Sequence, residues 1–153
     1  MVKEAYNKIK KKYKILPDYD ELNIEFEIGY INNEEFLLRE IRRKMNEKFI
    51  IFMERLCRIL QPEGISIVEF YEFGCLTKDQ KAELFNLLKE LRFQYRRFIN
   101  LDLILDYKEE AKTIRDGLKF WKSFRKKILP FFELVENCWA REYSEKEILK
   151  YLG

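Results

Sequence analysis

Apolar residues recur at three- and four-residue intervals along most of this 153-residue chain, which is the spacing of one face of an α-helix. The clearest case lies between residues 77 and 100, where seven apolar positions fall within a sector of about 120°. These positions are Leu84, Leu87, Leu88, Leu91, Tyr95, Phe98 and Ile99. Thr77 and Gln80 form a capping box at the start of the segment. The pattern predicts a long helix that buries this stripe in a core.

Two further segments carry the same spacing. Residues 33–60 run from Asn33, a predicted cap, to the Gln61-Pro62 pair, and their stripe is Leu37, Leu38, Ile41, Met45, Phe49, Phe52, Leu56 and Ile59. Residues 102–128 carry Ile104, Tyr107, Ala111, Ile114, Leu118 and Trp121. Near residue 100 the stripe shifts by about 130°, which favours a hairpin turn at Asn100–Asp102 over one continuous helix to Leu129. The fold class predicted is all-α, an antiparallel bundle with three long helices at about 33–60, 77–100 and 102–128.

Several short helices complete the predicted bundle. They begin near Lys3, Asp18, Ser66, Pro130 and Ser144, and capping boxes mark three of these starts, at Asp18, Ser66 and Ser144. For the helix after Asp18 a strand is the alternative, because polar and apolar residues alternate over residues 23–28, but the cap at Asp18 and Gly29 at the end favour a helix. We expect residues 1–153 to form a single helical domain, and leave open whether residues 1–32 are a peripheral N-terminal arm.

The face opposite the stripe of residues 77–100 carries aromatic and cationic side chains together. These are Phe85, Lys89, Arg92, Phe93, Arg96 and Arg97. A solvated face has no need of two phenylalanines, so we expect this face to be covered. We favour another helix of the same chain packing over both rings, with the cations extending to water at the rim. The alternative is a surface that binds a protein or a nucleic acid.

A second basic strip lies between residues 119 and 127. Its lysines Lys119, Lys122 and Lys126 form one row, and Trp121 and Phe124 lie nearly opposite on the predicted helix. Basic residues interleaved with aromatic ones are typical of nucleic-acid patches. The helical geometry instead turns these aromatic rings toward the core and leaves a row of lysines in water.

Charge is distributed unevenly, although the net charge is only +3. Residues 1–14 carry six lysines and one glutamate, and residues 15–33 carry five carboxylates and no cation. We expect these two blocks to neutralise each other across a hairpin. The basic segment 1–14 is too short, and its apolar face too narrow, for a membrane-surface helix, so we expect no membrane partner. Abundant Lys and Glu with only three Gln is typical of heat-adapted proteins, although the base composition of the coding DNA has the same effect.

Residues for common enzyme chemistry are missing. The chain has no histidine, few Ser and Thr, and no glycine-rich phosphate loop, so we expect a non-enzymatic protein without a cofactor. Asp18, Asp20, Glu21 and Glu25 are the one acidic cluster that could hold a hard cation such as Mg²⁺. Carboxylates in a first helical turn are also favoured by the helix dipole, and we therefore predict no metal site.

The three cysteines, Cys57, Cys75 and Cys138, are far apart and lack a C-x-x-C pair. No stretch resembles a secretory signal, and no apolar run approaches 18 residues. We therefore expect a cytoplasmic protein with reduced thiols, of which Cys57 and Cys138 are buried.

The sequence thus favours a helical protein-interaction or assembly module that does no catalysis. The run of residues 49–53 is apolar on every side, which suggests a homodimer. The alternative is an RNA- or DNA-binding protein that uses Arg92, Arg96, Arg97 and the 119–127 strip.

Overall fold

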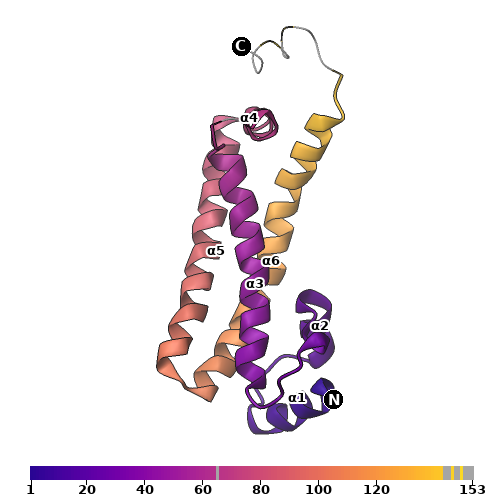
Figure 1. Cartoon of the computed structure of the whole chain (residues 1–153), viewed down its shortest axis with the longest axis vertical. Helices are drawn as coiled ribbons and strands as arrows, with labels where there is room; N and C mark the ends of the chain where they lie inside the picture. Colours follow the sequence, from indigo (N-terminus) through magenta and orange to yellow (C-terminus); the bar gives the residue numbers. More distant parts are fainter. Residues whose placement is uncertain (65, 143–145, 147–148, 150–153) are drawn as a thin grey trace. The chain divides into compact units, whose positions relative to one another are not determined.

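The computed structural model describes residues 1–64, 66–142, 146 and 149 of the chain (Figure 1). All regular structure in these residues is helical, which confirms the all-α class and the three long helices. The elements are α1 (Val2–Lys12), α2 (Tyr19–Phe26), η1 (Ile28–Tyr30), α3 (Leu37–Leu60), α4 (Ile67–Gly74), α5 (Lys78–Ile104) and α6 (Tyr107–Trp139). The short helix predicted at Ser144 lies outside the described residues.

The chain divides into two compact units, and each is described here by itself. The first unit comprises residues 1–51 and 92–123, and the second comprises residues 52–91 and 124–153. Helices α3, α5 and α6 each have one part in the first unit and the other part in the second unit. Whether the chain acts as a single domain stays a prediction.

The core of the first unit is built around Phe49 of α3. This ring is fully buried and lies edge-on to Phe98 of α5, with 5.2 Å between the ring centroids. Phe26 of α2 and Trp121 of α6 lie at 6.3 Å and 5.9 Å from it. Aromatic pairs at these separations are more favourable than their buried area alone implies. One aromatic cluster therefore joins four helices of the unit.

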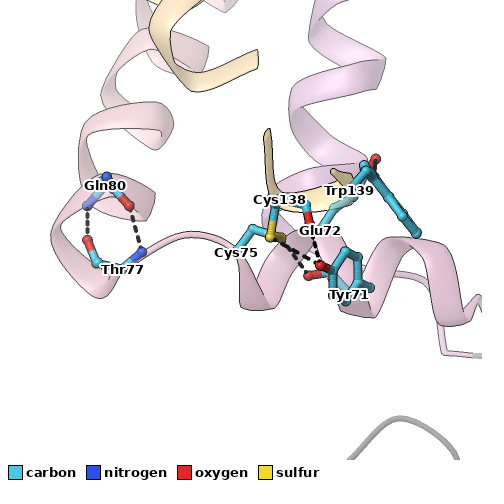
Figure 2. Close-up of a disulfide and its surroundings, with 7 residues drawn as sticks. All are labelled: Tyr71, Glu72, Cys75, Thr77, Gln80, Cys138 and Trp139. Atoms are coloured by element: carbon cyan, nitrogen blue, oxygen red, sulfur yellow. Dashed lines mark hydrogen bonds between the residues drawn. A yellow bond between two sulfur atoms is a disulfide. The ribbon is translucent and has the colours of Figure 1, made fainter. Parts of the chain in front are cut away.

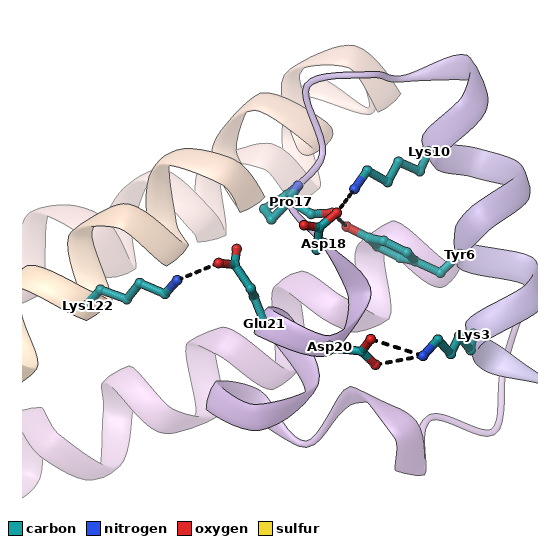
Figure 3. A network of polar contacts seen from close by, with 8 residues as sticks. All are labelled: Lys3, Tyr6, Lys10, Pro17, Asp18, Asp20, Glu21 and Lys122. Carbon is teal, nitrogen blue, oxygen red and sulfur yellow. Dashed lines mark hydrogen bonds and ion pairs between the residues drawn. The ribbon is translucent and has the colours of Figure 1, made fainter.

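The two N-terminal helices of the first unit are held together by the oppositely charged blocks, as predicted. Figure 3 shows Lys3 paired with Asp20 at 2.8 Å and Lys10 paired with Asp18. The buried Tyr6 hydroxyl donates to the carbonyl of Pro17 at 2.8 Å. Because Asp18 is engaged by Lys10, its side chain does not cap α2 as the sequence suggested.

Residues 19–26 are helical, which confirms the prediction of a helix over a strand, but Gly29 does not end that helix. Glu27 takes the left-handed conformation at the end of α2, with φ of 55°. Gly29 lies in η1, where its N–H donates to Oδ1 of Asn23 at 2.7 Å. With the hydrogen bond to the Asn23 side chain in place, the chain leaves the helix at Glu27, before the glycine that the sequence pattern indicated as its end.

The hairpin between α5 and α6 exists, but its turn comes four residues later than predicted. Helix α5 continues to Ile104, Leu105 adopts a left-handed φ of 55°, and α6 begins at Tyr107. Asp106 caps α6 by accepting from the N–H groups of Lys108 and Glu109. Leu101 is buried and extends the core-facing side of α5 beyond residue 100. The shift of the apolar stripe near residue 100 therefore shows where the buried side of the helix changes, and does not mark the end of the helix.

The start of a new helix at Pro130 was a wrong prediction, because α6 runs unbroken from Tyr107 to Trp139. Proline removes one helical hydrogen bond and usually ends or kinks a helix in its interior. Here Ile128 and Val135, on either side of Pro130 in the second unit, are both buried. Packing on both sides of the proline offsets the missing bond.

The second unit joins α4 to the end of α6 by a disulfide between Cys75 and Cys138 (Figure 2). The Tyr71 hydroxyl donates to the carbonyl of Cys138 at 2.7 Å, and Nε1 of Trp139 donates to Glu72 at 3.0 Å. None of the side chains of α4 is buried. The attachment of α4 therefore depends on this cross-link and on the polar contacts beside it.

Two of the prediction's cysteine assignments were wrong. Cys138 is buried as expected, but it is paired with Cys75 and is not a free thiol, while Cys57 is free and exposed. Spacing along the sequence could not reveal a pair separated by 63 residues.

The capping boxes are confirmed to different degrees. Thr77 and Gln80 form the complete reciprocal pair, with the Thr77 N–H donating to the Gln80 carbonyl at 2.8 Å and the Gln80 N–H to the Thr77 hydroxyl at 3.2 Å (Figure 2). Ser66 accepts from the Glu69 N–H at 3.3 Å, but the Glu69 carboxylate accepts instead from the N–H of Glu63.

Candidate functional site

Phe93 is the most exposed aromatic side chain on the aromatic and cationic face of α5, the face opposite its buried stripe. In the first unit its ring is 61% exposed, and the guanidinium carbon of Arg97 lies 6.0 Å from the ring centroid. The Arg97 guanidinium also lies 3.9 Å from the Asp116 carboxylate. The guanidinium carbon of Arg92 lies 4.9 Å from the centroid of the Tyr95 ring. Arg92 and Arg96 are exposed and have no carboxylate partner among the described residues. An uncovered ring thus stands among cations.

In the second unit, Phe85 of α5 is 53% exposed, and Lys89 is exposed as well. The expectation that another helix of the chain covers Phe85 and Phe93 is therefore wrong for the described part of the chain. The helices of a bundle cover the stripe facing the core, and the described chain leaves the outer face of α5 to the solvent. In the apolar run 49–53, Ile51 is also half-exposed, so that run is not enclosed on every side.

The geometry predicted for the 119–127 strip is confirmed. Trp121 and Phe124 are buried, and Lys119 and Lys126 are exposed. Lys122 pairs with Glu21 at 3.1 Å, as Figure 3 shows. Lys127 also pairs with a carboxylate, that of Glu90 at 3.4 Å. Two of the four lysines of the strip are therefore already partly neutralised, and the two rings that the sequence placed opposite the lysines are buried.

The acidic cluster at α2 does not converge on one point. Asp18, Asp20 and Glu21 each face a different lysine (Figure 3), and Glu25 is buried with its carboxylate accepting from Nε1 of Trp121 at 2.9 Å. Within the described ranges, no three acidic or cysteine side chains form a group suited to a metal ion. These carboxylates hold α2 in the first unit.

A buried ionic cluster in the first unit gave no signal in the sequence. Arg42 of α3 is only 2% exposed, and its guanidinium donates to the carbonyl of Phe98 and to Asp102. The buried carboxylate of Glu110 lies 3.6 Å from the same guanidinium. Burial raises the pKa of Glu110, although Arg42 and Arg39 act in the opposite direction. The cluster links three helices of the first unit.

The turn between α5 and α6 exposes a group of apolar side chains. Leu103 is 84% exposed, and Ile104, Leu105 and Tyr107 are each close to half-exposed or more. The periodicity predicts that Ile104 and Tyr107 share a buried stripe, and this prediction is wrong because the turn falls between them. Periodicity places a residue on a face, but it cannot show that the face ends at a turn.

Comparisons of the chain with models of known protein families, with curated proteins and with solved structures found no match. None of the described helices is long and apolar enough to cross a lipid bilayer.

Proposed function

We propose that this chain is a non-enzymatic interaction module that binds a protein partner, in the first instance a second copy of itself, through the outer face of α5. The observation that carries this proposal is the exposure of Phe93 among Arg92, Arg96 and Arg97. Burying a phenylalanine side chain contributes about 1.5–3 kcal/mol, a large incentive for association. Aromatic and Arg residues are also enriched at protein interfaces.

Phe85 gives independent support from the second unit. It too is more than half exposed, and Lys89 follows it one turn later on the same helix. In each unit, α5 therefore presents an uncovered phenylalanine beside at least one exposed cation. An exposed aromatic ring beside cations is the kind of residue that provides most of the binding energy at protein interfaces.

A second candidate function is binding to single-stranded RNA or DNA. It is favoured by the same exposed Phe93, because a ring flanked by arginines can stack on an unpaired base. The 119–127 strip adds less than its sequence suggests, since Trp121 and Phe124 are buried and Lys122 and Lys127 already face carboxylates. We therefore place the protein partner first.

Light scattering coupled to size-exclusion chromatography tests the first proposal. We expect a dimer mass at micromolar concentration, and at least a tenfold weaker association for Phe93→Ser. Ile24→Ser is the matched control, because Ile24 is 77% exposed on α2 of the same unit and belongs to no proposed interface. A monomer mass at every concentration contradicts self-association.

A filter-binding titration with homopolymer RNA and single-stranded DNA tests the second candidate. If about five phosphates are neutralised, affinity should fall roughly 10²–10³-fold between about 50 and 200 mM salt. Phe93→Ala should weaken single strands more than duplex. No retention at the lower salt concentration excludes nucleic acid and leaves the protein partner.

A further inference from the structure

We infer that the end of the first unit formed by α1 and the α5–α6 turn binds the surface of an anionic lipid bilayer. The sequence-based prediction of no membrane partner rested on the basic helix α1 alone. The structure adds an apolar element to that helix, namely the exposed side chains Leu103, Ile104, Leu105 and Tyr107. A basic surface and an apolar one together are the two signals that stable interfacial binding requires.

The conformation of Leu105 indicates that its side chain has a use outside the folded chain. Its φ of 55° lies in the left-handed region, where glycine or asparagine ends a helix at lower cost. Its side chain is 64% exposed, so packing within the chain does not explain a leucine at this position. A large aliphatic residue that is both strained and uncovered fits a turn that inserts into an apolar environment.

Two lysines of α1 lie beside this turn. Lys8 and Lys12 line one groove of about 340 Å³ together with Ile9, Tyr13, Glu35 and Tyr107. Tyr107 therefore connects the apolar turn to the basic helix within the first unit. Glu35 lines the same groove and offsets the charge of one of the two lysines, so the groove keeps a single net positive charge.

The other face of α1 determines which lysines are available. Figure 3 shows Lys3 and Lys10 engaged by Asp20 and Asp18, contacts that fix α1 against α2. The remaining lysines of this helix and of the residues after it are exposed and, among the described residues, face no carboxylate within ion-pair distance. They are Lys8, Lys11, Lys12 and Lys14. The helix and the residues directly after it thus present four exposed cations.

This combination suits a bilayer better than a protein partner. Lysine is depleted at protein interfaces, whereas lysines near an anionic lipid surface each strengthen binding roughly fivefold. A projecting turn of three aliphatic residues needs no matching cavity in a bilayer. Tyrosine is favoured at the level of the lipid head groups, which is where Tyr107 would lie if the leucines were inserted.

Co-sedimentation with lipid vesicles tests this inference on the full chain. We expect the protein to bind vesicles made of phosphatidylcholine and phosphatidylglycerol in equal amounts, and to bind pure phosphatidylcholine at least tenfold more weakly. Raising the salt from about 0.1 to about 1 M shortens the screening length from about 10 to about 3 Å and should release most of the bound protein. Absence of binding to the anionic vesicles overturns the inference and leaves this surface to a protein partner.

Variants separate the apolar and basic contributions. The double variant Leu103→Ser, Leu105→Ser should lose at least tenfold in vesicle affinity, and Ile24→Ser should bind like the wild type. Lys8→Gln with Lys12→Gln should lose roughly 25-fold, while the control pair Lys119→Gln and Lys126→Gln, with the same change of net charge, should lose little. Equal losses in test and control variants contradict the proposed surface.

A spectroscopic readout removes the dependence on sedimentation. The fluorescence of Leu103→Trp should shift to shorter wavelength on addition of anionic vesicles, and an unchanged spectrum contradicts insertion of the turn. Vesicle binding can be tested separately from the proposed protein interface. Phe93→Ser, which removes the ring of that interface, should leave vesicle binding unchanged. Conversely, the Leu103 and Leu105 variants should leave the light-scattering mass unchanged.

Discussion

Gly117 of α6 lies so close to Phe98 of α5 that no larger residue fits between them. A β-carbon at Gly117 would be 2.5 Å from Cζ of Phe98 and 2.9 Å from Cε of Met45. Both neighbours are fully buried, so neither can move away without disturbing the aromatic core. The glycine therefore sets how closely these helices approach each other.

Gly117→Ala should lower the free energy of unfolding by about 1–3 kcal/mol, the usual cost of overpacking a core. The substitution also improves helix propensity by up to about 1 kcal/mol, which makes any loss more telling. Urea unfolding followed by circular dichroism measures the change, with Ser123→Ala at an exposed site of α6 as the control. An alanine variant more stable than the wild type would contradict this packing.

Reduction of the Cys75–Cys138 disulfide should destabilise the second unit. The cross-link closes a loop of 63 residues, for which chain entropy predicts a contribution of about 4 kcal/mol. Cys75→Ser combined with Cys138→Ser should reproduce the effect of a reductant in urea unfolding. Cys57→Ser is the control, because this exposed thiol has no partner sulfur. Equal stability with and without reductant would show that the cross-link contributes nothing.

Removal of the buried Arg42 guanidinium should cost about 3–5 kcal/mol, because the buried Glu110 would lose the cation with which it forms an ion pair. Arg42→Met keeps most of the side-chain volume and isolates the charge. Arg43→Met is the matched control on the neighbouring position, where an exposed pair with Glu40 contributes little. Thermal unfolding of both variants decides the matter, and similar losses in the two would mean that Arg42 is not a structural ion.

The Glu110 carboxyl should give the fold a pH dependence of known sign. Burial raises its pKa in the folded chain, so the native state holds this proton at higher pH than the unfolded state does. Its contribution to stability is therefore fully present below the unfolded pKa and is lost as the pH rises through the folded pKa. Relative to Glu110→Gln, the wild type should gain stability as the pH is lowered from neutral to about 4. Parallel unfolding profiles for the two proteins would argue against a raised pKa.

Asp106, and not Asp102, should act as the cap of α6. Asp106→Ala should cost about 1 kcal/mol, because its carboxylate accepts from two N–H groups of the first turn. Asp106→Asn preserves an acceptor at this position and should lose much less. Chemical unfolding of the three proteins measures both steps, and equal losses in alanine and asparagine would mean that the charge matters and not the cap.

The sequence was informative wherever the signal is local. The Thr77–Gln80 box, the buried stripes of the long helices and the pairing of the N-terminal charge blocks all depend on residues whose partners are close or are set by helical spacing. The disulfide, the Arg42 cluster and the exposed turn at Leu103 depend on tertiary contacts between residues far apart, or on where a helix stops. Such contacts leave no periodic trace. For the same reason, the exposure of Phe93 became visible only in the structure.

The interleaving of the two units has a consequence for synthesis on the ribosome. Residues 92–123 complete the first unit, yet they follow 40 residues that belong to the second. The opening 51 residues must therefore wait for most of the chain before they gain their partners Phe98 and Trp121. Neither unit corresponds to a continuous stretch of the gene, so no single cut yields two fragments that each contain one whole unit, and a premature stop codon before residue 123 would leave both units unfinished.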